Sequence, residues 1–71
     1  MTLLTNEEKI NIINSHLKNL EYNKFSIEIS IVEENAKNNP LAETLTSLNA
    51  QISEIDSQVA ALQTELASLT A

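Results

Sequence analysis

The sequence contains no cysteine, no glycine and no tryptophan, and it has a single proline. Without cysteine there can be no disulfide and no thiolate zinc site. Glycine supplies the backbone conformations that tight turns and phosphate-binding loops require, so its absence excludes a phosphate loop and disfavours a sheet protein. Only Tyr22 and Phe25 are aromatic, which leaves Leu, Ile and Val to form any core. These absences favour an all-α protein.

The chain is short for a protein that has neither a disulfide nor a cysteine-based zinc site to stabilise it. Its 71 residues make one domain at most, and a domain of this size buries only about 60% of its unfolded surface. Small scaffolds usually need a disulfide, a metal or association with other subunits. Cysteine is absent and His16 is the only histidine. We therefore expect self-association, with a dimer as the first expectation.

Charge is unevenly distributed along the chain. The net charge is −6, and all four lysines precede Pro40. An acidic chain repels phosphate, so we expect no nucleic-acid partner. Neither half has the lysine-rich polar face that binds anionic membranes. The acidic balance favours solubility and would also suit an inhibitor that docks on a basic surface.

The first residues indicate where the protein acts. Met1-Thr2-Leu3-Leu4 lacks the basic start and long apolar stretch of a secretory signal. No run approaches the roughly 20 apolar residues needed to span a bilayer. We expect a cytoplasmic protein, or a component of a particle assembled in the cytoplasm. The abundance of Asn, Ile and Lys before Pro40 would suit an AT-rich genome, such as that of a phage.

Pro40 divides the chain into two predicted helices. The residue before a proline avoids the helical region, and Asn38 can adopt the left-handed conformation that ends many helices. Asn39 would cap a second helix with Pro40 at its first position. We predict helices over about 5–38 and 40–70, with a turn at about 38–40. A connection this short predicts an antiparallel two-helix hairpin. The alternative is one long helix broken only at Pro40, with partners supplying all burial.

The second half carries an unbroken heptad pattern. Its apolar residues alternate spacings of four and three, as in a coiled coil. They are Leu41, Leu45, Leu48, Ile52, Ile55, Val59, Leu62, Leu66 and Leu69. Such a stripe must be buried, because isolated helices gain little from helix propensity alone.

The first half shows a capping box and a matching stripe. Thr5 and Glu8 have the spacing at which each side chain bonds the other's backbone N–H. The stripe contains Ile10, Ile13, Leu17, Leu20, Ile27 and Ile31, with Lys24 at one position. The predicted intrachain seam joins Ile10, Ile13, Leu17 and Leu20 to Leu45, Leu48, Ile52, Ile55, Val59, Leu62 and Leu66.

A second apolar row lies on nearly the opposite face of the first helix. Tyr22, Phe25, Ile29 and Val32 follow the same spacing, and Ala36 continues it. One partner helix cannot cover two faces. We therefore predict that Tyr22, Phe25, Ile29 and Val32 contact another subunit, and that hairpins associate into a helical bundle.

Residues 25–31 also fit a strand, because apolar and polar residues alternate strictly there. Such a strand could pair only between subunits, since the chain offers no second strand. We predict a helix and keep an intersubunit strand as the alternative.

No constellation of residues indicates catalysis. His16 and Ser15 are adjacent in sequence and so point in different directions on a helix. Glu7-Glu8 and Glu33-Glu34 fall at predicted helix ends, which water reaches. General acid–base catalysis by two carboxylates needs a shared, partly dry site. No glutamate precedes His16 by three residues, as di-metal bundles require. We predict no catalytic residues, no metal, no cofactor and no small-molecule substrate.

Two functions remain. The first is a non-enzymatic structural or assembly module that acts through helical packing. The second is an acidic adaptor or inhibitor that offers a helical face to a different protein. Mass in solution separates them, because only the first requires a stable oligomer.

Overall fold

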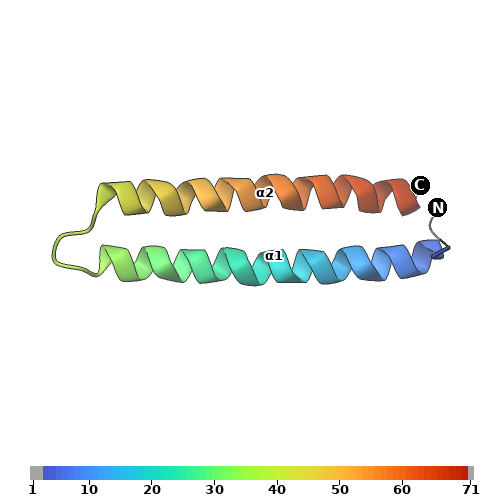
Figure 1. Cartoon of the computed structure of the whole chain (residues 1–71), viewed down its shortest axis with the longest axis horizontal. Coiled ribbons are helices and arrows are strands. Elements are labelled where there is room, and N and C mark those ends of the chain that lie inside the picture. Colours follow the sequence, from blue (N-terminus) through green and yellow to red (C-terminus); the bar gives the residue numbers. More distant parts are fainter. Residues whose placement is uncertain (1–2, 71) are drawn as a thin grey trace.

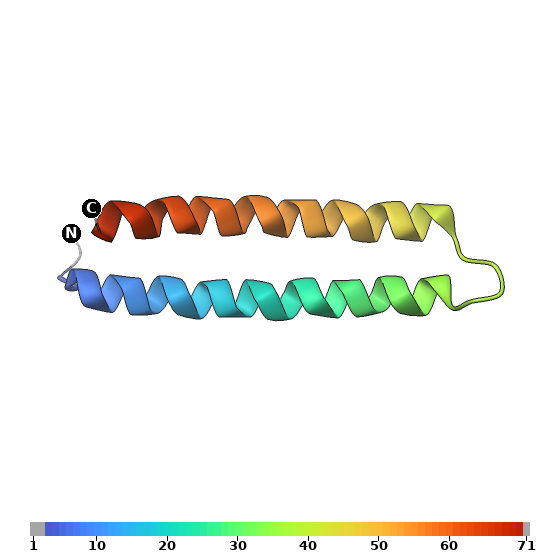
Figure 2. The same ribbon diagram turned by 180° about the vertical axis from the view of Figure 1, so that it is seen from behind.

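A computed structural model describes residues 3–70, which form two helices, α1 (Asn6–Asn35) and α2 (Ala42–Thr70). The helices run antiparallel and side by side, joined by one loop (Figures 1 and 2). Residues 3–70 contain no strand, and residues 25–31 lie within α1. The prediction of an all-α antiparallel hairpin is confirmed, and the strand alternative is wrong.

The predicted capping box fixes the start of α1. The Glu8 N–H donates to the Thr5 hydroxyl (3.1 Å), and the Thr5 N–H donates to the Glu8 carboxylate (2.9 Å). Two N–H groups that have no partner within the helix are thereby satisfied. Beside this end, the Asn6 side-chain amide donates to the Leu69 carbonyl at the end of α2 (3.5 Å).

The loop differs from its prediction. Helix α1 ends at Asn35 and α2 begins at Ala42, so the connection is longer than expected. The cap residue Ala36 is right-handed (φ −79°, ψ −10°), and its N–H is shared between the Val32 and Glu33 carbonyls. No residue in the described part has positive φ, so the left-handed role predicted for Asn38 is wrong.

The start of α2 was also mispredicted. The first helical bond there runs from the Leu45 N–H to the Leu41 carbonyl (3.1 Å), which gives Leu41, not Asn39, the capping position. Pro40 therefore precedes the helix. The Leu41 side chain, the first in the heptad series, is 60% exposed because it lies outside α2.

The hairpin is a thin rod. It measures 54 × 20 × 15 Å, and its radius of gyration is 16.4 Å. A compact chain of this length would have a radius of gyration of about 11 Å. Its accessible surface is 5420 Å². Since a compact protein of the same mass exposes about 4,400 Å², the hairpin leaves an unusually large area uncovered.

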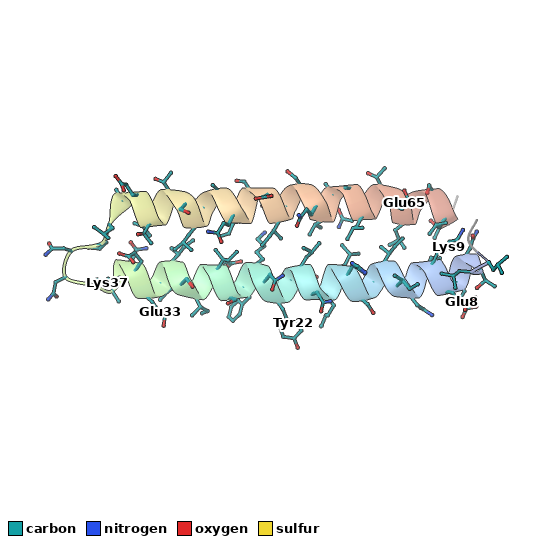
Figure 3. All side chains as sticks on the ribbon, in the orientation of Figure 1. Glu8, Lys9, Tyr22, Glu33, Lys37 and Glu65 are labelled. Atoms are coloured by element: carbon teal, nitrogen blue, oxygen red, sulfur yellow. The ribbon has the colours of Figure 1, made fainter. Side chains whose placement is uncertain are left out.

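The core between the helices is correspondingly small. Among residues 3–70, Ile55 is the only buried apolar residue, and it retains 8% exposure. Each helix covers only one stripe of the other, so the remaining seam side chains stay half-buried. Figure 3 shows side chains of both helices extending into the space between α1 and α2. Packing of this kind leaves little stability in reserve.

Candidate interaction surface

Four large apolar side chains form a stripe on α1 that α2 does not cover. Tyr22, Phe25, Ile29 and Val32 are 68%, 63%, 42% and 62% exposed, respectively. Spacings of three and four residues place them on one helix face. We call this stripe the outer row. Figure 3 shows Tyr22 projecting away from α2.

The borders of the outer row are polar. Lys18 and Glu21 line a shallow depression together with Tyr22 and Phe25. Glu28 and Glu33, at the other borders, are exposed. Towards the amino end, the same helix face carries Lys18, Ser15 and Asn11, which are also exposed. The apolar part of this face is therefore confined to residues 22–32, about 15 Å along the helix.

The residues assigned to the intrachain seam lie on the faces that α1 and α2 turn to each other. Ile55 is buried, and the other ten are half-buried: Ile10, Ile13, Leu17, Leu20, Leu45, Leu48, Ile52, Val59, Leu62 and Leu66. Ile27, Ile31 and Leu69 continue the stripe with similar burial. The seam occupies one face of each helix, so within residues 3–70 the outer row has no partner.

An ion pair crosses the seam near its middle. Lys24 Nζ donates to Asp56 Oδ1 at 2.7 Å. This hydrogen bond, followed by the charge of Asp56, raises the pKa of Lys24. In the sequence, Lys24 stands at one position of the first stripe, and Asp56 follows Ile55 of the second stripe. Their pairing follows from the register between the helices, which no spacing within either half reveals.

A second polar contact ties the loop to α1. Glu34 is 5% exposed and is the only buried polar residue among residues 3–70. The Leu41 N–H donates to its Oε2 (2.9 Å), and Lys37 Nζ donates to its Oε1 (3.0 Å). The bond from Leu41 and then that from Lys37 lower the pKa of Glu34.

The prediction that Glu33 and Glu34 are both solvated is wrong for Glu34. Only Glu33 is exposed. The Glu34 carboxylate lies at the positive end of α2 and satisfies an N–H that the helix cannot. Lys37 lies beyond the end of α1 and pairs with Glu34. The signal available in sequence was that position 34 continues the three/four series of the first stripe.

Within residues 3–70, the remaining polar candidates do not come together in a catalytic or metal-binding site. His16 and Ser15 are exposed, and His16 borders a shallow groove beside Leu20 and Leu62. The Glu8 carboxylate accepts the Thr5 N–H in the capping box. Within residues 3–70, no three His, Cys, Asp or Glu residues are close enough to hold a metal ion. None of the helices in that part of the chain has the length and hydropathy of a membrane span.

Comparison with known proteins adds no relative. No protein-family model, curated protein or solved structure matches this chain. The outer row therefore stands as the candidate functional site on its geometry alone.

Proposed function

We propose that this chain is a small non-enzymatic assembly module that binds protein through the outer row of α1. The observation that carries the proposal is the exposure of Tyr22, Phe25, Ile29 and Val32 together on one stripe of α1. The partner is a protein, and neither nucleic acid, membrane, cofactor nor small-molecule substrate is involved. The module acts in the cytoplasm or in a particle assembled there.

The size and composition of the row support this role. At their exposed fractions, the two aromatic side chains alone leave roughly 250 Å² in water. Contiguous apolar patches of a few hundred Å² on a soluble protein are commonly binding sites. Tyr and Phe are also enriched in interfaces, where a polar rim surrounds an apolar centre. Lys18, Glu21 and Glu33 supply such a rim here.

A second function is favoured by the charge of the other helix. Helix α2 has no basic residue, and Glu43, Glu54 and Glu65 are exposed on it. An acidic adaptor or inhibitor would use this helix against a basic partner, and its binding would weaken steeply with salt. Binding through the outer row would depend much less on salt, since its centre is uncharged.

Site-specific photocrosslinking tests the proposal. A benzophenone amino acid replaces Tyr22 in the full chain, expressed in the cells that naturally produce it. The matched control carries the same group at Ser57, which is exposed on α2. We expect a discrete crosslinked protein product from position 22 and none from position 57. Equal products from both positions, or none from position 22, would refute a role for the outer row.

A further inference from the structure

We infer that the protein bound on the outer row is a second copy of this chain, packed antiparallel through α1 about a two-fold axis level with Ile27. The inference rests on the proposed function and names its partner. The resulting dimer has a central pair of α1 helices, each covered on its far side by its own α2.

The order of residues in the outer row makes it self-complementary. Phe25 and Ile29 stand two residues to either side of Ile27, and Tyr22 and Val32 stand five to either side. Reversing a second copy about this level places each aromatic residue opposite an aliphatic one. Phe25 then meets the second copy's Ile29, and Tyr22 meets its Val32. A two-fold contact requires this property, because the same patch must serve both partners.

The polar residues on the same face favour the antiparallel direction. With the axis level with Ile27, α1 helices overlap over about residues 19–35, so Ser15 and Asn11 remain in water. A parallel pair in register would instead bring two Lys18 side chains together inside the contact. Like charges held together in this way oppose association.

Charge complementarity points the same way. The antiparallel register puts Lys18 level with the second copy's Ala36, at the carboxyl end of its α1. That end carries the negative pole of the helix dipole, and α1 has no basic residue in its last turn. Exposed Glu33 lies in the same turn. Lys37, the residue after Ala36, is already paired with Glu34, so the acidic side chain left for Lys18 of the second copy is Glu33.

The uncovered area matches what a dimer requires. The hairpin exposes 5420 Å², about 1,000 Å² more than a compact protein of its mass. A standard interface removes about 800 Å² from each partner. One contact along α1 would thus bring the chain close to the surface area of a compact protein.

Light-scattering mass of matched variants tests the interface. We expect the native chain to have the mass of a dimer. Phe25→Glu should raise the dimer dissociation constant on the order of 100-fold or more, because each dimer loses two central anchors. Ser15→Glu adds the same charge to the same helix face outside the overlap, and it should leave the dimer intact. Equal effects of the two substitutions would overturn the inference.

Distances between spin labels test the direction without depending on a destabilised variant. The chain has no cysteine, so Ser15→Cys and Ser26→Cys each provide one labelling site. The antiparallel register separates the two residue-15 positions by about 36 Å along the axis and leaves the residue-26 positions nearly level. A parallel dimer would give short distances at both positions and would refute the register.

The same measurements distinguish this inference from the proposed function. A native chain of monomer mass that crosslinks from position 22 to a different protein would refute the second copy and preserve the outer row as a binding site. A monomer that gives no crosslink from position 22 would refute both.

Discussion

Glu34 shows how much one side chain decides in a molecule with so small a core. Its carboxylate accepts bonds from the Leu41 backbone and from Lys37, and it is buried where the loop meets both helices. The loop has no glycine, so its path depends on side-chain bonds of this kind. Glu34 therefore closes the hairpin and caps α2 at the same time.

Glu34→Gln should lower the melting temperature at pH 7 by roughly 5 °C, because it removes the charge that Lys37 and the start of α2 stabilise. The pKa of Glu34 is lowered from its ordinary 4.5, so its contribution is complete above that value and is lost as pH falls through the lowered pKa. The difference between native and variant proteins should shrink below pH 4.5 in thermal melts followed by circular dichroism.

Glu33→Gln is the matched control. It removes the same charge from the neighbouring position, but Glu33 is exposed and should affect stability little. If both variants melt alike at pH 7, the closing role of Glu34 is wrong.

At the scale of the helices, two local devices set where α1 begins and how it is aligned with α2. The capping box fixes the first turn, and the Lys24–Asp56 pair joins the helices midway along the seam. A polar residue at one seam position commonly specifies register, because sliding the helices would leave it among apolar neighbours. Leucine-rich stripes by themselves tolerate such sliding.

Thr5→Ala should lower the free energy of unfolding by about 1 kcal/mol, since the first turn loses its side-chain acceptor. The Thr5 backbone bond and then its hydroxyl hold the pKa of Glu8 below its ordinary 4.5. Losing the hydroxyl bond should move that pKa part of the way back. Urea denaturation measures the first effect and an NMR titration of Glu8 the second; Thr5→Ser, which retains the hydroxyl, should change neither.

Exchanging the two charges tests the ion pair across the seam. Lys24→Asp and Asp56→Lys should each lower the melting temperature by a few degrees, because each puts like charges side by side. The double variant should recover most of the loss. A double variant whose loss equals the sum of the single losses would show that the two side chains do not interact.

Considered as a whole, the hairpin is a rod with a half-buried seam and an uncovered apolar stripe on α1. Because the core is thin, a partner that covered the outer row would also stabilise the folded hairpin. Anything that binds only the folded state stabilises it by mass action. If the partner is a second copy, stability must depend on protein concentration.

The melting temperature of the native chain should therefore rise as its concentration is increased 100-fold, as it does for proteins that fold together with their partner. Phe25→Glu should melt at a lower temperature that varies much less over the same range. Circular dichroism in cells of different path length measures both. A native melting temperature independent of concentration would argue against dimerisation.

The sequence by itself determined the helices, the capping box and the two faces of α1. These features follow from short-range spacing, since residues three and four apart share a helix face whatever the tertiary structure. The absence of glycine favoured helices, and the hairpin was predicted from the lone proline and from the matching apolar stripes on both sides of it. The predicted helix ends near Pro40 were wrong, because the structure there depends on a hydrogen bond between residues on opposite sides of the loop, Glu34 and Leu41.

Only the tertiary structure decided which polar side chains meet. Lys24 finds Asp56 because the helices adopt one register, and Glu34 is buried because the loop folds back to place the Leu41 N–H against it. Both contacts join residues from different elements, and their partners depend on how those elements align in space. The spacing of apolar residues within one helix shows which face of that helix is apolar. It does not show how that helix aligns with the other helix or with the loop.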